Sequence, residues 1–328
     1  MKSQFCRFQW GSVVTLQFVL LALLLSACLP HPSESLRIAS SPWPGYEPLY
    51  LAREIGYLPG NQANIFELPS SDITLQSFIN RSADMATLTL DETMELLHSG
   101  VKLRILVVMD ASNGADAVMV SPKIKQLSDL KGKRIAIENI PLGAYMLSRL
   151  LDAAKLTRAD VRVIHSPESK HAELYQQNKA DAFITFEPFK THLAALGAHD
   201  IFNSSDIPNE IFDLLVVHED VYLQRRKEVC FVARQWFKTL EFMRQSPDQA
   251  AASISTRLGV TTAEYHAMVN GINTPSLQEN HRLLTGEHPE IIKPANMLNA
   301  VMMKEGQLTH AVDIVAGLDP ALKSCLAN

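Results

Sequence analysis

The sequence predicts an α/β fold with two lobes in tandem and a helical C-terminal third. From Leu36 onward, short apolar runs alternate with amphipathic segments, which is the pattern of βαβ units and parallel sheets. A second series of this kind begins after a turn at residues 128–131, and strand-like runs disappear beyond Val221. With 328 residues and 47% hydrophobic residues, the chain is long enough to bury the cores of two domains.

The first series begins with a strand that ends at Pro42-Trp43-Pro44-Gly45, because proline and glycine together break regular structure. Thr89 or Asp91 is placed to cap a helix that ends before Gly100. In chain order we expect strands at 36–39, 65–68, 84–88, 104–109 and 117–120, helices at 47–57, from 72 and after 89, and a polar loop at 110–116.

The second series leads into the helical remainder of the chain. Here we expect strands at 133–137, 161–164, 181–186 and 211–217 and helices at 144–154, 168–178 and 221–245. The chain passes from the first lobe to the second near residue 116 and returns near residue 214. We therefore assign residues 36–115 and 215–328 to lobe 1 and residues 116–214 to lobe 2.

The first 28 residues resemble a lipoprotein signal peptide. Lys2 and Arg7 form a basic start, the apolar run 13–25 is too short to span a bilayer, and Leu25-Ser26-Ala27-Cys28 resembles the box that bacterial signal peptidase reads. This predicts signal residues 1–27, a diacylglyceryl group on Cys28 and a tether at 28–35. An ordinary cleaved signal with an incidental cysteine and an uncleaved anchor are the alternatives.

Charge and cysteine content narrow the function further. Without the two basic residues of the signal, 28 basic residues stand against 35 acidic ones, a net charge of −7. This balance argues against nucleic acid as a partner, since a phosphate backbone requires a basic face.

Cys230 and Cys325 are the two cysteines beyond Cys28, and an oxidising periplasm would permit a disulfide between them. Two separate buried thiols are the equal alternative, because sequence cannot supply the geometry of a bridge.

Ligands of such sheets bind beyond the carboxyl ends of strands, which here points to loops from both lobes and so to a cleft between them. Trp43, Tyr46 and Tyr145 offer rings that stack on a flat group or cation, and the carboxylates favour a ligand with N–H donors or positive charge. The candidate ligand-binding residues are Trp43, Tyr46, Thr87, Thr89, Asp91, Asn113, Asp116, Gly143, Tyr145 and Glu187. Simpler roles compete with this one: Trp43 as a core aromatic, Asp91 and Glu187 as helix caps, and Asn113 as a turn residue.

The sequence gives little support to enzyme chemistry or metal binding. It contains no G-x-S-x-G elbow, no phosphate-binding G-x-x-x-x-G-K-[ST] loop, no G-x-G-x-x-G and no H-E-x-x-H. The eleven histidines are scattered, and no C-x-x-C pair is present. We therefore expect neither a catalytic residue, nor a metal, nor a cofactor.

Several short motifs, in order along residues 36–220, resemble type II periplasmic solute-binding proteins, the Venus-flytrap proteins of ABC importers. The branch is the one that binds nitrate, sulfonates, taurine and thiamin pyrimidines. The motifs are Arg37-Ile38-Ala39, Trp43-Pro44-Gly45-Tyr46, Pro48-Leu49-Tyr50-Leu51-Ala52, Ile55-Gly56-Tyr57, Asp84-Met85-Ala86-Thr87, Leu130-Lys131-Gly132-Lys133, Asp181-Ala182-Phe183 and Phe186-Glu187-Pro188. The resemblance implies two lobes that close on a ligand and then dock on a membrane permease.

The chain also departs from the oxyanion-binding members of this branch. Those members commonly carry hydroxyl residues where this chain has Leu142-Gly143-Ala144, and a helix N-terminus with Ser or Thr donors holds anions well. We therefore expect a small heteroaromatic or amine-bearing metabolite as ligand. The predicted protein is a monomer, anchored by lipid on the periplasmic face of the inner or outer membrane, that delivers this ligand to an ABC importer permease. The alternatives are a ligand-sensing module for a membrane signalling receptor and an enzyme on the same scaffold.

Overall fold

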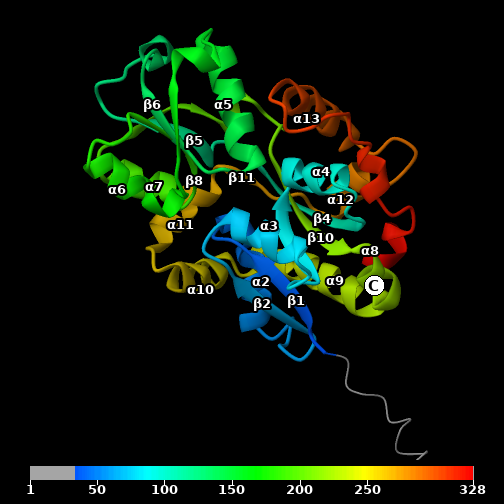
Figure 1. Ribbon diagram of the computed structural model, residues 1–328. Coiled ribbons are helices and arrows are strands. Elements are labelled where there is room, and N and C mark those ends of the chain that lie inside the picture. The colour runs from blue at the N-terminus through cyan, green and yellow to red at the C-terminus, as the bar shows by residue number, and fades with distance from the viewer. Residues whose placement is uncertain (1–33, 328) are drawn as a thin grey trace, which may run out of the picture. The chain divides into compact units, whose positions relative to one another are not determined.

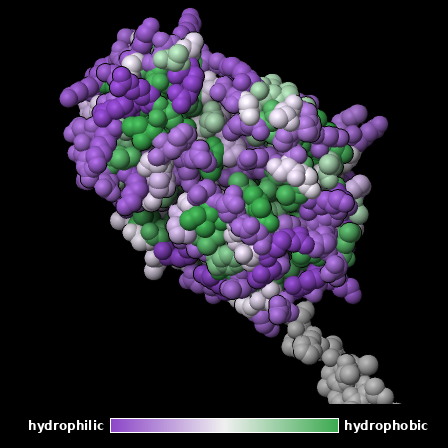
Figure 2. All heavy atoms as spheres, in the orientation of Figure 1, coloured by the Kyte–Doolittle hydropathy of each residue, from purple (hydrophilic) through white to green (hydrophobic). Residues whose placement is uncertain are grey.

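The computed structural model describes residues 34–327, in which two β-sheets and their helices form one compact unit from Leu36 onward (Figure 1). The predicted signal peptide, the lipidated Cys28 and most of the tether lie outside the described residues. None of the helices within 34–327 has the length and apolarity that crossing a bilayer requires. The face drawn in Figure 2 is mainly hydrophilic, with its hydrophobic residues in separate areas.

The first sheet has six strands in the order β11-β4-β10-β3-β1-β2. Its strands are β1 (Leu36–Ser40), β2 (Ala63–Glu67), β3 (Met85–Thr89), β4 (Leu103–Ser112), β10 (Phe212–His218) and β11 (Ile272–Asn273). β1, next to the edge strand β2, runs parallel to β2 and β3, whereas β10 runs antiparallel to both β3 and β4. Four of the strands are buried along almost their whole length, which explains their continuous apolar runs.

The second sheet has five strands in the order β7-β6-β8-β5-β9. Its strands are β5 (Asp116–Val120), β6 (Arg134–Ile137), β7 (Arg162–His165), β8 (Ala182–Phe186) and β9 (His199–Asn203). β6 runs parallel to β7 and β8, and β5 runs antiparallel to β8 and β9. The chain therefore crosses from one sheet to the other twice, between β4 and β5 and again between β9 and β10.

Helices cover both sheets. α3, α4 and α12 pack on the six-stranded sheet and α5 and α7 on the five-stranded one, while α13 lies against both α4 and α5 (Figure 1). The helices are α2 (Glu47–Glu54), α3 (Ser71–Ile79), α4 (Leu90–His98), α5 (Pro141–Ala154), α6 (His171–Gln176), α7 (Phe189–Ala195), α8 (Glu219–Gln224), α9 (Arg226–Gln245), α10 (Pro247–Leu258), α11 (Thr262–Val269), α12 (Leu277–Leu284), α13 (Ile292–Lys304) and α14 (Leu322–Leu326).

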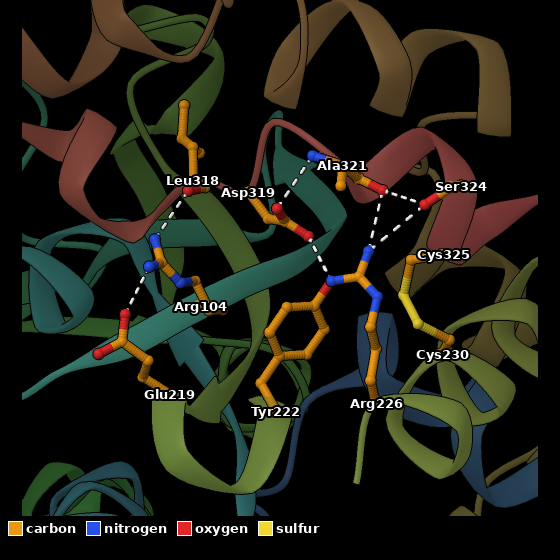
Figure 3. A network of polar contacts seen from close by, with 10 residues as sticks. All are labelled: Arg104, Glu219, Tyr222, Arg226, Cys230, Leu318, Asp319, Ala321, Ser324 and Cys325. Carbon is orange, nitrogen blue, oxygen red and sulfur yellow. Dashed lines mark hydrogen bonds and ion pairs between the residues drawn. A yellow bond between two sulfur atoms is a disulfide. The ribbon is translucent and has the colours of Figure 1, made fainter. Parts of the chain in front are cut away.

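The C-terminal segment is fastened to the helix α9 (Figure 3). A disulfide joins Cys230 of α9 to Cys325 of α14, with 5.0 Å between their Cα atoms, so the bridge and not a pair of free thiols is formed. Beside it, the Tyr222 hydroxyl donates to the carboxylate of Asp319, and Nη1 of Arg226 lies 3.1 Å from Oδ2 of the same group. The chain end is thus held by one covalent bond and a polar network.

Several predicted boundaries are wrong, each for a local reason. The predicted loop 110–116 begins with Asp110, which belongs to β4 because it pairs with Asp213 of β10. The predicted helix 221–245 is two helices that meet at Arg225, whose φ of −124° is not helical. The predicted helix 144–154 begins earlier, at Pro141, a residue that suits a first helical turn.

Other elements differ in length or were not predicted. The predicted helix 47–57 ends at Glu54, and the predicted helix 168–178 is a 3-10 turn at Glu168–Lys170 followed by α6. The edge strands β9 and β11 were not predicted, and β11 contradicts the expectation that strands disappear beyond Val221. β9 is polar and β11 has two residues, so neither carries the apolar pattern by which strands are recognised.

Candidate functional site

Three aspartates meet where the two sheets face each other. Asp213 of β10 lies directly opposite Asp110 of β4 in the strand register and opposite Thr89 of β3 on its other side. Asp116 is the first residue of β5 in the other sheet. All three carboxyl groups are buried, with exposures of 0% for Asp110 and 4% for each of the other two. The sheet register therefore gathers acidic side chains that are far apart in sequence.

Aromatic side chains from the loop after β1 bind two of these carboxyl groups. The indole Nε1 of Trp43 donates to Oδ2 of Asp110 at 3.1 Å, and the hydroxyl of Tyr46 donates to Oδ1 of Asp213. Gly45 lies against this contact, since a Cβ there would come 2.0 Å from Oδ2 of Asp110. The Pro44–Tyr46 turn, a 3-10 helix with proline at its start, sets the two rings in place.

Burial dominates the electrostatics of the three aspartates. It raises the pKa of Asp110 and of Asp116 to about 7, and it raises the pKa of Asp213 well above the ordinary range, where the charge of Asp110 adds to the effect. Burial and the Asp213 charge also raise the pKa of Tyr46 well above its ordinary value, so this hydroxyl stays a donor. Removing ionised carboxylates from water without a cation is unfavourable, and these pKa values express that cost.

The space beside the aspartates, which we call the cleft, is narrow and has an apolar wall. Its volume is about 20 Å³, room for about one water molecule. The rings of Trp43 and Phe186 meet edge to face across it at 6.0 Å, one from each sheet's side. The lining residues are Ser41, Pro42, Trp43, Tyr46, Ser71, Thr89, Asp116, Leu142, Phe186, Ile211 and Asp213.

Four of the ten candidate residues line the cleft, namely Trp43, Tyr46, Thr89 and Asp116. Thr89 also caps α4, where its hydroxyl accepts from the Glu92 N–H while the Glu92 carboxylate accepts from the Thr89 N–H. Thr89 and not Asp91 is therefore the cap. Asp91 is 2% exposed, its Oδ2 has no hydrogen-bond partner, and burial raises its pKa to about 6.

Five further candidates make contacts of other kinds. The Thr87 hydroxyl lies 3.2 Å from Oγ of Ser40 in the neighbouring strand. Asn113 is exposed and its N–H donates to the carbonyl of Gly271 at 2.8 Å. A Cβ on Gly143 would come 2.5 Å from the carbonyl oxygen of Glu138, so this glycine permits close packing of α5.

The last two of these five are Tyr145 and Glu187. The Tyr145 hydroxyl donates to the carboxylate of Glu210, which also accepts from Arg149 at 2.8 Å. This contact ties α5 to the segment that leads back to β10. The carboxylate of Glu187 accepts from the Thr191 N–H at 3.1 Å near the start of α7, and burial raises its pKa.

Four acidic residues of this region were absent from the predicted site: Asp110, Asp213, Glu92 and Glu138. Their exposures are all 5% or less. The signal that could have found Asp213 is a charged residue inside the apolar run 211–217, since an unpaired charge in a buried strand is costly. Within residues 34–327, no three His, Cys, Asp or Glu side chains are arranged to hold a metal ion.

The two-sheet arrangement is that of type II periplasmic binding proteins. The periplasmic aliphatic sulphonate binding protein SsuA from Escherichia coli aligns with a TM-score of 0.70 at 16% identity, over 88% of this chain and 98% of that one. The ligand-binding component of an ABC-type import system from Staphylococcus aureus aligns with a TM-score of 0.75 at 10% identity, over 90% and 99%. The desulfurization enzyme DszB aligns with a TM-score of 0.65 at 16% identity, over 89% and 99%. These likenesses establish the fold.

Sequence comparison is more specific about the family. No curated protein matches the chain. The model of the NMT1-like family matches residues 30–258, which is more than half of the sequence and includes the strands and loops that build the cleft. The chain belongs to the NMT1-like family.

Proposed function

We propose that this protein is the extracytoplasmic solute-binding component of an ABC importer and that its ligand is a small organic molecule with positive charge or several N–H donors. The observation that carries the proposal is the set of three buried aspartates at the cleft, of which Asp116 and Asp213 line it and Asp110 lies behind, paired with Asp213 across the strands. Within residues 34–327 none of them forms an ion pair with lysine or arginine. Lys190, whose Nζ donates to the Gly114 carbonyl, is a cation whose charge lowers the pKa of Asp116 against the larger effect of burial.

A cationic ligand would supply the missing countercharge. Hydrogen bonds between an ammonium or amidinium group and a carboxylate are about twice as strong as neutral ones, and a buried site strengthens them further. An anion such as a sulfonate would instead approach several carboxylates. The rings of Trp43 and Phe186 add an apolar wall against which a flat heterocycle or a carbon chain can pack.

Lobe closure is part of this proposal. The lobes are residues 36–115 with 215–328 and residues 116–214, and the crossings between β4 and β5 and between β9 and β10 supply the hinge. At a volume of about 20 Å³ the cleft admits no organic ligand in this conformation, so entry requires the lobes to separate. The closed, liganded form is the one that docks on the permease.

Isothermal titration calorimetry tests the ligand class. A panel of alkylamines, aminopyrimidines, sulfonates and nitrate is titrated at about pH 8, above the pKa of about 7 of Asp110 and Asp116. We expect binding of an amine or aminopyrimidine, and a loss of at least about 10-fold in affinity for Asp110→Asn. The exposed Glu173→Gln is the matched control, because it removes one negative charge away from the cleft. Tight binding of a sulfonate alone would overturn the proposal.

An enzyme on the same scaffold is the alternative function, because the fold is similar to that of DszB. Recovery of the bound molecule unchanged after denaturation would separate binding from conversion.

We also propose that a lipid on Cys28 anchors the protein to the membrane and that the tether keeps the binding domain near the permease. Mass spectrometry of the mature N-terminus from the native host should find a diacylglyceryl cysteine, and an unmodified N-terminus at another residue would contradict the anchor.

A further inference from the structure

We infer that the end of helix α13 is a clasp that holds the two lobes together when no ligand is bound. The clasp consists of Lys304, Glu305 and Gln307, and its partners lie on α5 of the other lobe. This inference rests on the proposed function, because it concerns the movement of the lobes that the proposed function requires. It goes further by naming contacts outside the cleft that set how often the empty protein opens.

The main part of α13 is fixed to lobe 1. Leu298 and Met302 are buried, and the helix packs against α4 (Figure 1). The side chain of Asn299, which is 5% exposed, binds the main chain of Val312 twice: Nδ2 donates to the carbonyl and Oδ1 accepts from the N–H, each at 2.8 Å. Buried hydrogen bonds are costly to leave unmade. Helix α13 should therefore move with lobe 1.

The end of α13 reaches helix α5, which belongs to lobe 2. Nζ of Lys304 lies 3.1 Å from Oδ1 of Asp152, in the last turn of α5. One residue further along the chain, Oε1 of Glu305 accepts from Oγ of Ser148 at 2.9 Å. These two contacts join the lobes directly through side chains.

The third contact of the clasp lies next to the cleft. Nε2 of Gln307 donates to the carbonyl of Pro141 at 3.3 Å. Pro141 is the first residue of α5, and Leu142, which follows it, lines the cleft. The clasp therefore holds a helix that forms part of the cleft wall, and releasing it frees that wall.

The clasp is of a kind that can break and form again. The side chains of Lys304 and Asp152 are 57% and 49% exposed, and Glu305 is exposed as well. Water and salt compensate for much of the loss of such contacts, so each contributes little. Buried bonds thus fix α13 to one lobe and solvent-accessible bonds hold it to the other, which is the asymmetry that a reversible restraint requires.

The clasp also lies apart from the crossings that supply the hinge. Contacts at the crossings, such as that between the hydroxyls of Ser112 and Ser204 at 2.8 Å, lie near the axis and change little when the lobes rotate. An open groove of about 1590 Å³ separates the first half of α13, at Met297, from Pro208 and Asn209 of the connection between β9 and β10. Rotation of lobe 2 would therefore separate the contacts at the end of α13.

Closure of the empty cleft needs a restraint of this sort. The cleft has a volume of about 20 Å³, and Asp116 and Asp213, which line it, are each 4% exposed. Taking these carboxyl groups out of water disfavours the closed form of the empty protein, whether they stay ionised or take up protons. Contacts outside the cleft oppose that effect, so losing the clasp should shift the empty protein toward the open form.

Distances between two spin labels test the clasp in the unliganded protein. The labels are attached to introduced keto amino acids at the exposed positions Glu54 in lobe 1 and Lys123 in lobe 2, which leaves the cysteines unlabelled. The closed distance is the one between these positions in this structure. Replacing Lys304, Glu305 and Gln307 together with alanine should raise the ratio of open to closed molecules at least about 10-fold, because each solvent-accessible polar contact contributes about 2-fold or more.

A matched control removes the same three residue types within one lobe. Lys170, Glu173 and Gln177 are exposed, and both Lys170 and Gln177 contact the Glu173 carboxylate. Replacing these three with alanine should leave the ratio unchanged. Ser148→Ala removes one clasp contact from the α5 side and should raise the ratio about 2-fold or more.

The outcomes separate the clasp from the proposed function. An unchanged ratio in the triple variant, shown by circular dichroism to be folded, would overturn the clasp. An equal shift in the α6 control would overturn it too, because the effect would then come from net charge and not from the contact between the lobes. Neither result concerns the ligand. Calorimetry decides the ligand class independently, since binding of a sulfonate and of no amine refutes the proposed function whatever the ratio.

Discussion

Replacing Asp110 with asparagine should change how the stability of the unliganded protein depends on pH. Burial raises the pKa of Asp110 from 3.8 to about 7 in the folded chain. Between these values the folded protein keeps a proton that the unfolded chain releases, so the free energy of unfolding falls as the pH rises. The stabilising effect of protonation is present below about pH 4 and is lost above about pH 7.

The size of this effect follows from the shift. A difference of about three pKa units corresponds to about 4 kcal/mol, with a slope of at most about 1.4 kcal/mol per pH unit. Asparagine cannot titrate, yet its carbonyl can still accept from the Trp43 indole and its amide can donate to Asp213. The variant should therefore gain stability relative to wild type as the pH rises from about 5 to 7, by about 1.4 kcal/mol per unit.

Urea unfolding of both proteins, followed by circular dichroism at several pH values, measures this difference. The wild-type protein must be measured beside the variant because other titratable groups make the free energy of unfolding rise with pH. Burial lowers the pKa of His171 to about 4, so this residue alone makes the folded state more stable as the pH rises toward 6.5. That contribution cancels between variant and wild type. A difference that stays constant from about pH 5 to pH 7 would refute the reasoning, and Glu173→Gln should show none.

Two other perturbations test the packing and the cross-link. Gly45→Ala should destabilise the protein by about 1 to 3 kcal/mol in thermal unfolding, because the new Cβ would lie 2.0 Å from Oδ2 of Asp110. Gly60→Ala, with no atom within 4 Å of the new Cβ, should leave stability nearly unchanged, and equal effects would contradict the contact. Reducing the Cys230–Cys325 disulfide should cost up to about 4 to 5 kcal/mol in urea unfolding, since its cysteines are 95 residues apart, and no loss would refute that entropic estimate.

The order of strands and helices was predictable because most strands are buried on both faces. Continuous apolar runs such as those of β4 and β10 are readable without knowing their partners. The edge strands β9 and β11 were missed because hydrogen bonds to a neighbour, and not an apolar pattern, define them. The break at Arg225 was missed for a similar reason, since helical spacing continues through it.

The sequence indicated residues of the candidate site only where they lie in loops or at the end of a strand. Trp43 stands out between prolines, and Asp116 lies at the edge of an apolar run. Asp110 and Asp213 contribute through the pairing of two strands about 100 residues apart, and no local pattern reports that register. For Tyr145 the sequence did not predict the partner that the structure shows, since its hydroxyl donates to the carboxylate of Glu210, a residue 65 positions further along the chain.

Under the proposed function, the three buried aspartates Asp110, Asp116 and Asp213 make closure of the lobes depend on charge. With the lobes apart, water solvates the carboxylates and each keeps an ordinary pKa. Bringing them together removes that water, so the empty protein can close only by taking up protons, whereas a cationic ligand supplies the compensating charge directly. Ligand and protons then compete for the same carboxylates. Affinity for an amine should fall as the pH drops below about 7, the pKa of Asp110 and Asp116, because acid stabilises the empty closed form.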